Sequence, residues 1–334
     1  MNIAVVGCTG VVGTKVLQVL SRLDFDFESL YLFASKKSAG KTVFFKGRAL
    51  LVEELNLKNL QNKKINIAFF VAGSQVATAY AHHFLRGGAV VIDNSSYFRL
   101  QNKVPLVVPE VNPEDLFLHN GIIANPNCST IMLMPVLSML DKVYGVKRVV
   151  VSTYQAVSGA GAKGIEALTS GQLGFTNNDF PIRLYSNAVP LIGATNKNGY
   201  TEEENKIILE SKKILHRPDL KITATAVRVP CFNCHSQSVN VELCKKYEFN
   251  RLIGQLSTIN GVQLKHQNLT ENSIPNVPTT LDADGGFDIF LGRVRSDNSN
   301  KKALNFWLVF DNLLKGAALN AVQIAKLVVK NNLY

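Results

Sequence analysis

The sequence contains few cysteines and no run of apolar residues long enough to span a membrane. Only five cysteines occur among 334 residues, and the N-terminus has no basic segment of the kind that opens an export signal. An odd, sparse set of this kind predicts reduced thiols rather than a disulfide framework. A membrane-spanning helix needs about 20 consecutive apolar residues, and the apolar runs here are shorter. We therefore expect a cytoplasmic protein with no membrane partner.

Acidic residues are scarce relative to basic ones. The chain has 36 Lys and Arg against 25 Asp and Glu, a net charge of +11. Such a balance is typical of nucleic-acid binding or of anionic small-molecule ligands. The basic residues are scattered in short pairs such as Lys36-Lys37, without a stripe or interleaved aromatics. We therefore expect a lysine-rich solvated surface and no nucleic-acid partner.

The first third of the chain alternates apolar runs with glycine-rich breaks. Continuous Val, Ile and Phe runs are typical of strands buried on both faces, which indicates a parallel sheet with crossover helices. The expected strands are 2–7, 30–35, 65–72, 89–95, 104–111 and 121–127, and the expected helices are 11–21 and 75–85. This pattern predicts an α/β, Rossmann-like dinucleotide-binding domain over residues 1–127.

The pattern of expected strands and helices changes after about residue 146. The expected strands are 146–158, 222–230, 236–244, 288–296 and 303–311, and the expected helices are 164–173 and 202–216. This predicts an α+β catalytic and dimerisation domain, 128–311, with a large mixed or antiparallel sheet. The closing segment, 313–329, has the spacing of an amphipathic helix. We expect the C-terminal part, 312–334, to return to the first domain.

A glycine-rich turn joins the first predicted strand to the first helix. Its sequence is Gly7-Cys8-Thr9-Gly10-Val11-Val12-Gly13. Glycines at such a corner let the backbone approach a pyrophosphate at the helix N-terminus. The spacing is GxxGxxG rather than GxGxxG, so the alternative is a tightly packed corner without a ligand.

The second predicted strand ends in a basic, hydroxyl-rich turn. An NAD site usually places Asp or Glu there for the ribose 2′-hydroxyl, but this chain has Ser35, Lys36, Lys37 and Ser38. Cations and hydroxyls suit a 2′-phosphate. We therefore expect NADP as the cofactor; the alternative is an exposed basic turn.

Cys128 follows a predicted strand and opens an apolar helical segment. Unpaired N–H groups and the helix dipole at that place favour a thiolate and can hold an oxyanion. Pro135 falls inside the predicted helix and indicates a kink or a late start. Chemistry alone leaves two alternatives for Cys128, a nucleophile or a buried structural cysteine.

Four sequence blocks make a specific resemblance. They are NPNCST (125–130), TYQAVSGAG (153–161), GYTEEENK (199–206) and RVPCFNCH (228–235). In order and spacing they resemble the signature blocks of the bacterial-type aspartate-semialdehyde dehydrogenase family, and the similarity runs from Met1 to about Lys326. The resemblance implies an NADP-dependent phosphorylating aldehyde dehydrogenase that forms a homodimer through its second domain, or a dimer of dimers.

The resemblance also implies the chemistry. It gives a role in lysine, threonine and methionine biosynthesis, with L-4-aspartyl phosphate, aspartate semialdehyde and phosphate as the small-molecule partners. Cys128 would form a thioester, phosphate would leave, and NADPH would reduce the acyl group to the semialdehyde. Two alternatives stay open at this point: another acyl-phosphate reductase, such as N-acetyl-glutamyl-phosphate reductase, or a catalytically dead homologue that acts as a binding protein.

The resemblance implies roles position by position. Cys128 matches the acylated nucleophile, Gln155 the glutamine that orients the thioester, and His235 the acid/base histidine. The residues expected to bind substrate are Arg99 for phosphate with Lys206 assisting, Arg228 for the α-carboxylate and Glu203 for the amino group. The residues expected to bind the cofactor are Gly7, Thr9, Gly10, Val11, Val12, Gly13, Ser35, Lys37, Ser38, Gly73, Ser95, Ser158, Gly159 and Asn312.

These residue types suit the chemistry, although each has a plain alternative. A guanidinium binds a planar carboxylate in two places, and histidine transfers protons near neutrality. Glu203 and Lys206 share a helix face at i, i+3 and form a surface ion pair in the alternative interpretation. Arg228 and His235 are seven residues apart, so in one regular strand they point to opposite faces. We expect Pro230 or a bulge to break that alternation.

The same block contains a literal C-x-x-C-H, Cys231 to His235. This pattern is typical of c-type haem attachment and resembles half a zinc site. Because no export signal and no second cysteine pair accompany it, we expect packing cysteines and no metal.

Overall fold

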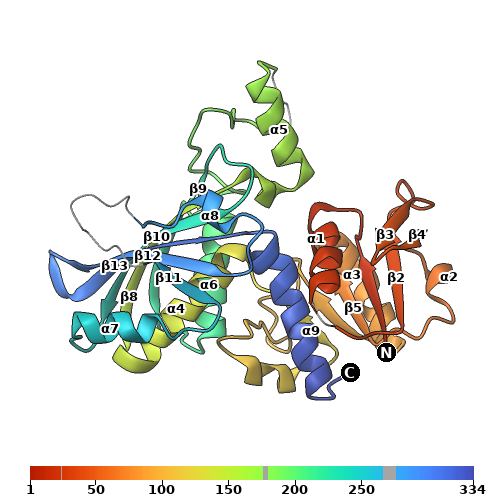
Figure 1. Ribbon diagram of the computed structural model, residues 1–334, viewed down its shortest axis with the longest axis horizontal. Coiled ribbons are helices and arrows are strands. Elements are labelled where there is room, and N and C mark those ends of the chain that lie inside the picture. The colour runs from red at the N-terminus through yellow and green to blue at the C-terminus, as the bar shows by residue number, and fades with distance from the viewer. Residues whose placement is uncertain (24, 176–179, 266–275) are drawn as a thin grey trace. The chain divides into compact units, whose positions relative to one another are not determined.

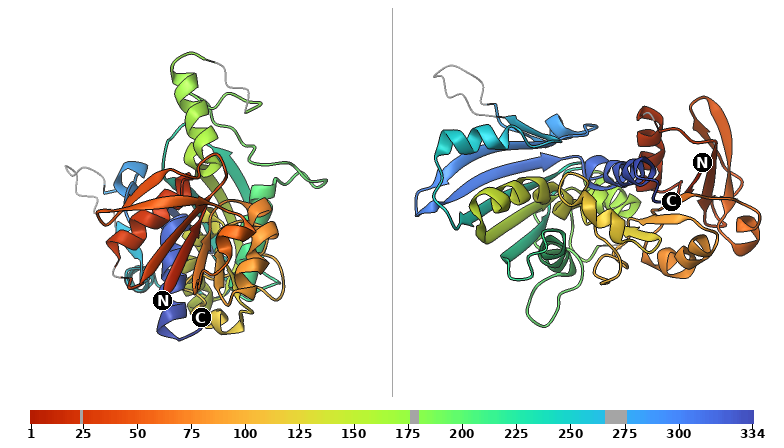
Figure 2. Two further views of the ribbon diagram at one scale, coloured as in Figure 1. Left: turned by 90° about the vertical axis from the view of Figure 1, so that its right-hand side faces the viewer. Right: turned by 90° about the horizontal axis from the view of Figure 1, so that it is seen from below.

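The computed structural model describes residues 1–23, 25–175, 180–265 and 276–334. The described chain forms two compact units, each with its own sheet. The first comprises Met1–Asn127 and Ala317–Tyr334, and the second comprises Cys128–Gly316. Figures 1 and 2 show the elements of each unit in chain order by colour. Among the described residues, no helix has the length and apolar character that crossing a membrane requires.

The first unit is built on a seven-stranded sheet in the order β3-β4-β2-β1-β5-β6-β7. All neighbouring strands are parallel except β3 and β4, which form an antiparallel hairpin. The predicted parallel sheet is therefore confirmed. The strands are β1 (Asn2–Val6), β2 (Ser29–Ala34), β3 (Thr42–Phe45), β4 (Arg48–Glu54), β5 (Ile67–Phe70), β6 (Val90–Asp93) and β7 (Ile122–Ala124).

Crossover helices cover this sheet. Helix α1 (Val11–Arg22) connects β1 to β2, and α3 (Ser74–Arg86) connects β5 to β6. The two crossovers run in opposite directions along the sheet, so their right-handedness places the helices on opposite faces. Helix α9 (Asn320–Lys330) packs against α1 and β6. The short helices of this unit are α2 (Leu57–Leu60) and the 3₁₀ helix Pro113–Leu118.

The strand expected at 104–111 is wrong. Only an isolated bridge joins Leu106 to Ala124 in this segment. Pro105 and Pro109 cannot donate to a strand ladder. The side chain of Asn112 takes over part of the pairing, accepting from the Val108 N–H at 3.0 Å and donating to the Leu106 carbonyl at 2.9 Å.

The second unit is built on a six-stranded mixed sheet, as predicted. Its order is β11-β12-β13-β10-β8-β9, with β8/β9 and β11/β12 parallel and the other pairs antiparallel. Its strands are β8 (Val146–Gln155), β9 (Lys221–Arg228), β10 (His235–Leu243), β11 (Val262–Lys265), β12 (Ile289–Asp297) and β13 (Asn300–Phe310). Helices α4 (Cys128–Tyr144) and α6 (Glu202–Ile214) pack against strands of this sheet. The other helices of the unit are α5 (Ala162–Gln172), α7 (Phe249–Leu256), α8 (Thr280–Ala283) and the 3₁₀ helix Val157–Ala160.

The segment expected to be helical, 313–329, is helical, but its first part is not an α-helix. A π-helix, Leu314–Leu319, precedes α9. The Asp311 carboxylate accepts from the N–H groups of Leu313 and Leu314 at 2.8 and 3.0 Å, which fixes the start of this turn. π-Turns are rare and often occur at functional sites, and this one contains Gly316, which contacts Cys128.

Candidate active site

The carboxyl ends of the parallel strands bring the expected dinucleotide residues to one edge of the first sheet. The glycine turn follows β1, the basic turn follows β2, Gly73 follows β5, and Ser95 follows β6. β1 is also the point where the strand order reverses, with β2 on one side and β5 on the other. Dinucleotides bind at such a switch point in doubly wound sheets.

The glycine turn has the close packing that a dinucleotide-binding corner requires. Gly7 has a φ of 92°, and a Cβ there would lie 2.9 Å from Ala72 Cβ. A Cβ on Gly13 would lie 2.1 Å from the Gly7 carbonyl oxygen. Helix α1 begins at Val11 after Gly10, which offers no side-chain cap. The first N–H groups of α1 therefore have no capping side chain and suit an anion.

The basic turn after β2 folds on itself. The N–H groups of Ser38 and Ala39 donate to the Ser35 carbonyl at 2.8 and 3.1 Å. Ser35 and Lys37 are exposed, and no acidic residue occurs between Ala34 and Lys41. The turn therefore presents hydroxyl and ammonium groups to a ligand.

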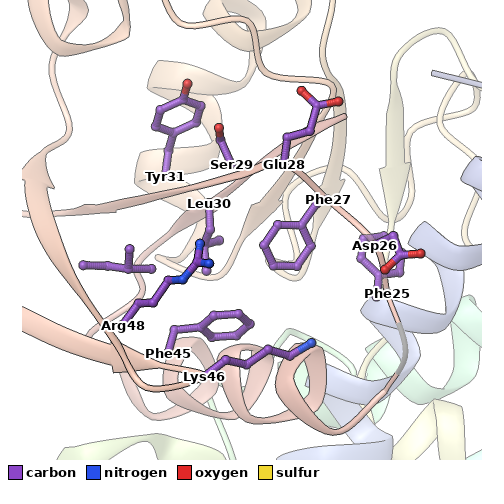
Figure 3. Close-up of a pocket in the computed structure, with 11 residues that line it drawn as sticks. Phe25, Asp26, Phe27, Glu28, Ser29, Leu30, Tyr31, Phe45, Lys46 and Arg48 are labelled. Atoms are coloured by element: carbon purple, nitrogen blue, oxygen red, sulfur yellow. The ribbon is translucent and has the colours of Figure 1, made fainter.

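A cavity of about 600 Å³ lies at the other end of the same sheet (Figure 3). Phe27, Phe45 and Arg48 are among the residues that line it, from the segments that precede or begin β2 and β4. The rings of Phe27 and Phe45 are 5.8 Å apart. Because the expected dinucleotide residues lie at the carboxyl ends of the strands, this cavity is not part of their site.

Arg99 is buried within the first unit and its guanidinium is held by main-chain carbonyls. Its Nε donates to the Asn125 carbonyl and one terminal nitrogen donates to the Asn94 carbonyl, both at 2.9 Å. The Ser95 side chain also has a fixed orientation, because its hydroxyl donates to the Asp93 carboxylate at 2.6 Å. Burial raises the pKa of the Asp93 carboxyl, against the opposing effects of Ser95 and Arg99.

Cys128 is the first residue of helix α4 in the second unit. The helix begins at Cys128 and continues through Pro135 to Tyr144, so of the two alternatives expected from Pro135, a kink or a late start, the late start is wrong. The Cys128 side chain is half-buried, and its negative charge as a thiolate interacts favourably with the Arg228 guanidinium. A helix start and a nearby cation both favour the thiolate, which is the nucleophilic form.

Gly316 packs directly against the nucleophile. A Cβ on Gly316 would lie 2.9 Å from Cys128 Cβ and 2.8 Å from the Phe310 ring. Such contacts are too close for any other residue without movement of Cys128 or Phe310. The absence of a side chain at 316 therefore helps to set the place of Cys128.

Strand register puts three expected site residues in one row. Gln155 at the end of β8 pairs with Arg228 at the end of β9. On the other side β10 pairs with β8 so that Ser236 lies opposite Tyr154, which brings His235 opposite Gln155. Directly opposed residues point to the same face with Cβ atoms about 5 Å apart. The sheet thus aligns Arg228, Gln155 and His235 side by side.

The spacing problem between Arg228 and His235 is thereby resolved. The alternation is broken between the two residues, as expected, but not by a bulge: β9 ends at Arg228, Pro230 lies in the connection, and β10 begins at His235. The connection between them includes Cys234 at a φ of 70°. Two separate strands, with β8 between them, carry the two side chains on one face.

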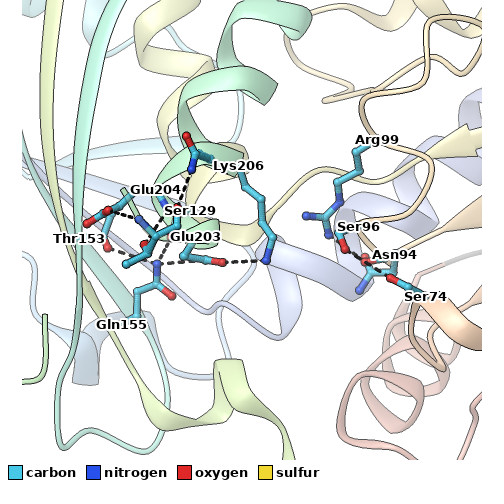
Figure 4. Close-up of polar contacts among 12 residues, drawn as sticks. Ser74, Asn94, Ser96, Arg99, Ser129, Thr153, Gln155, Glu203, Glu204 and Lys206 are labelled. Atoms are coloured by element: carbon cyan, nitrogen blue, oxygen red, sulfur yellow. Dashed lines mark hydrogen bonds and ion pairs between the residues drawn. The ribbon is translucent and has the colours of Figure 1, made fainter. Parts of the chain in front are cut away.

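Gln155 is the centre of a buried polar network (Figure 4). Its Nε2 lies 3.0 Å from Ser129 Oγ, 3.2 Å from Thr153 Oγ1 and 3.2 Å from Glu203 Oε1. The other Glu203 oxygen pairs with Lys206 Nζ at 3.3 Å. Because Glu203 is buried, this pair is more than the surface ion pair of the alternative interpretation.

Ala156 holds both His235 and Arg228 with its main chain. The Ala156 N–H donates to His235 Nδ1 at 3.1 Å, and its carbonyl accepts from Arg228 Nη1 at 2.7 Å. Nδ1 is therefore the unprotonated nitrogen, and the neutral ring carries its proton on Nε2. His235 is fully buried, and its Nε2 has no hydrogen-bond partner among the described residues. The Nε2–H is thus available to a ligand.

Two electrostatic effects act on the row. Burial and the adjacent Arg228 charge lower the pKa of His235 to about 3. Burial also lowers the pKa of Arg228, while the charges of Glu203 and Cys128 oppose that shift. His235 is therefore a neutral hydrogen-bond donor in the ligand-free site, next to a guanidinium.

The remaining expected residues of this unit, Ser158, Gly159 and Asn312, lie next to Arg228, His235 or the connection that precedes His235. A Cβ on Gly159 would lie 3.0 Å from Arg228 Nη1 and 3.1 Å from His235 Nε2. Asn312 donates to Ser158 Oγ at 3.1 Å and accepts from the Cys234 N–H at 3.0 Å. The second unit thus brings together Cys128, Gln155, Ser158, Gly159, Glu203, Lys206, Arg228, His235 and Asn312. Arg99, expected to bind phosphate, and the remaining expected cofactor residues lie in the first unit.

The cysteines of the C-x-x-C-H block have raised pKa values. Burial raises the pKa of Cys231 and, with the nearby charges of Asp311 and Asp284, that of Cys234. Sγ of Cys234 and one oxygen each of Asp284 and Asp311 lie within 4.8 Å of one another. Asp311, however, accepts from main-chain N–H groups of the π-turn and of Gly285. These contacts explain Asp311 as a structural residue.

The buried His235 predicts a specific dependence of stability on acid. The unfolded chain protonates this histidine below about pH 6.5, whereas the folded chain keeps it neutral down to about pH 3. Stability from this residue is therefore complete above about pH 6.5 and falls as the pH drops. At pH 5 the loss is about 2 kcal/mol, from about 1.4 kcal/mol per pH unit. Denaturant unfolding of the wild type and of His235→Gln at pH 7 and pH 5 measures it; equal losses in both proteins would contradict the assignment.

Comparison with known proteins first defines the class. Residues 2–119 match the family described as "Semialdehyde dehydrogenase, NAD binding domain", and residues 136–315 match "Semialdehyde dehydrogenase, dimerisation domain". The two matches span most of both units. The chain thus has both domains of the semialdehyde dehydrogenase class.

Comparison with individual relatives identifies the family within this class. Aspartate-semialdehyde dehydrogenase of Bacillus subtilis is 42% identical, over 100% of this chain and 99% of its own, and that of Aquifex aeolicus is 44% identical over 99% of both. The crystal structure of aspartate semialdehyde dehydrogenase II from Vibrio cholerae superposes with a TM-score of 0.92 at 38% identity, covering 98% of each chain. A second structure of that Vibrio enzyme is described as complexed with ASA. This chain belongs to the aspartate-semialdehyde dehydrogenase family, which confirms the resemblance of its motifs.

Four contributors to the site were not among the residues named from the sequence. Ala156 acts through its main chain, and Gln237 donates to the carbonyl of Ser129, the residue that follows Cys128. Gly316 acts through the absence of a side chain. A periodicity argument could have placed Gln237 on the face of His235, two residues away, but nothing in the sequence indicates its partner.

Proposed function

We propose that this protein catalyses the NADPH-dependent reductive dephosphorylation of L-4-aspartyl phosphate to L-aspartate 4-semialdehyde. The observation that carries the proposal is the row of Arg228, Gln155 and His235, which lies on one sheet face with Arg228 interacting with the Cys128 thiolate. The crystallised Vibrio relative is complexed with ASA, and family membership makes the same substrate the first choice here. This activity belongs to lysine, threonine and methionine biosynthesis.

The charges of the second unit fit an amino acid. Arg228 would bind the α-carboxylate with its planar guanidinium, and Glu203 would contact the amino group. The two charges already interact in the ligand-free protein. A zwitterion therefore meets one partner for each of its charged groups. The acetylated amine of an N-acetylglutamyl substrate would not suit the Glu203 carboxylate, which disfavours the rival reductase.

Arg99 and Lys206 are proposed to bind phosphate. Arg99 has a fixed orientation, because two main-chain carbonyls hold its guanidinium. Lys206 is held by Glu203 in the substrate-free protein. A fixed guanidinium and an ammonium suit an acyl phosphate and its leaving group.

The covalent step starts from the Cys128 thiolate. It attacks the acyl carbon, the bond from that carbon to the phosphate oxygen breaks, and phosphate leaves with the electron pair. NADPH supplies a hydride for the resulting thioester. The His235 Nε2–H donates to the oxygen that becomes negative, and Gln155 orients the acyl group. The carbon–sulfur bond then breaks, which releases the semialdehyde and returns the thiolate.

The first unit is proposed to hold NADP. The close packing at Gly7 and Gly13 and the uncapped start of α1 fit a pyrophosphate. The exposed turn with Ser35, Lys37 and Ser38 fits the 2′-phosphate. Ser158, Gly159 and Asn312 of the second unit are assigned to the nicotinamide end.

We propose a homodimer formed through the second unit. Helices α4 and α6 pack on the sheet face of Gln155 and Arg228, and the alternate residues point to the other face. That face carries Tyr154 and Trp307, whose rings are 5.3 Å apart and remain partly exposed. Aromatic residues of this kind are enriched in interfaces. Light scattering distinguishes a dimer from a dimer of dimers or a monomer of 36.7 kDa.

The reverse reaction tests the proposal most simply. Purified protein is mixed with aspartate semialdehyde and phosphate, and reduction of NADP or NAD is followed by absorbance. We expect turnover with NADP and slower turnover with NAD. Without phosphate, each chain should complete one turnover and then stop. Preference for N-acetylglutamate semialdehyde would instead support the rival reductase, and no turnover with either aldehyde would support a binding protein.

A further inference from the structure

Gln237 is a fully buried polar residue close to the nucleophile. It lies on β10 two residues after His235 and on the same face of the sheet. Its Nε2 donates to the main-chain carbonyl of Ser129 at 2.7 Å. Its Oε1 is buried and has no hydrogen-bond partner among the residues that the structure describes. A buried unpaired oxygen destabilises the fold, so stability alone does not explain this side chain.

Ser129 is the residue that directly follows Cys128 in the first turn of α4. Gln155 on β8 binds the Ser129 hydroxyl, and Gln237 on β10 binds the Ser129 carbonyl. Ser129 itself is fully buried. Two neighbouring strands therefore hold the main chain and the side chain of one residue, next to the nucleophile.

We propose that Gln237 is a positioning residue, which fixes the first turn of α4 to the strand that carries His235 and so sets Cys128 relative to His235. The inference rests on the proposed function and extends it to a residue outside the signature blocks. Attack on an acyl carbon depends steeply on geometry, and a displacement of about 1 Å can lower a rate about 100-fold. Gln237 would therefore affect kcat without contacting the substrate.

The variant Gln237→Met tests this role, because methionine fills a similar volume but cannot donate. We expect kcat to fall about 10-fold to 100-fold, with the KM of each substrate within about threefold of wild type. We expect Tm to change little, because removal of the unpaired oxygen offsets loss of the hydrogen bond to the Ser129 carbonyl. The alkylation rate of Cys128 by iodoacetamide should change as well. Wild-type kcat would overturn the proposal, and so would a kcat that falls only together with Tm in both Gln237→Met and Gln237→Leu.

Ser211→Ala provides a matched control. Ser211 is fully buried in α6, and its hydroxyl has no hydrogen-bond partner among the described residues. Its removal should leave Tm equal or higher and kcat unchanged; a comparable loss of kcat would overturn a specific role for Gln237. The Cys128→Ala variant separates the two claims: if it keeps activity, the proposed function fails, whereas wild-type activity of Gln237→Met beside an inactive Cys128→Ala overturns only this inference.

Discussion

Replacement of Cys128 by alanine is expected to lower kcat by about four to six orders of magnitude, the range that loss of an activated nucleophile produces. Cys128 begins α4 and its thiolate interacts with Arg228, and none of the other site residues offers a thiol. Without the thioester, hydride would have to reach an acyl phosphate directly. Turnover is measured in both directions, and the Kd of NADP for the variant, measured by direct binding, shows whether the first unit still binds cofactor.

Cys244→Ala is the control for this prediction. Cys244 is an exposed cysteine of the same unit, and its replacement should leave kcat unchanged. Cys128→Ser should resemble the alanine variant, because a serine hydroxyl is much harder to ionise than a thiol. Activity of Cys128→Ala within tenfold of wild type would rule out the covalent scheme.

Replacement of Arg228 by lysine is expected to lower kcat/KM about 100-fold to 1,000-fold, which corresponds to about 3–4 kcal/mol. Lysine keeps the charge but cannot bind a planar carboxylate in two places. It also cannot reproduce the hydrogen bond from Arg228 to the Ala156 carbonyl, the residue whose N–H orients His235. We therefore expect both a higher KM for the aspartyl substrate and a lower kcat.

Arg217→Lys is the matched control for Arg228. Arg217 lies in the same unit and pairs with Asp141 and Asp219 at 2.6 and 2.9 Å, so its replacement removes an arginine ion pair outside the proposed site. The control should keep kcat/KM within about threefold of wild type. If Arg228→Lys did the same, Arg228 would not be the carboxylate clamp.

The sequence predicts those strands whose burial requires a continuous run of apolar residues. The central strands β1, β5 and β6 were predictable because both faces are covered and their residues are almost all apolar. The hairpin of β3 and β4 was missed because most of its residues are partly or fully exposed. At 104–111 an apolar run proved to be buried without a ladder, because two prolines interrupt it and Asn112 pairs with its main chain.

The site was predictable to the extent that it consists of side chains in recognisable blocks. Arg228 and His235 could be named, and the expected strands 222–230 and 236–244 already separated them, but the sequence could not show that Gln155 lies between them. Register decides that arrangement, and register depends on pairing across the whole sheet. The main-chain contacts of Ala156 and the close approach at Gly316 have no signal in a single sequence, because they depend on position rather than on residue type.

A single-turnover burst tests the central claim, acylation of Cys128 by an aspartyl group, most directly. The protein is mixed with aspartate semialdehyde and NADP in the absence of phosphate, and the acid-quenched chain is digested for mass spectrometry. The account predicts a rapid burst of about one NADPH per chain and an aspartyl adduct on the peptide that contains Cys128, both lost in Cys128→Ala. Absence of the burst, or an adduct on any other residue, would contradict it.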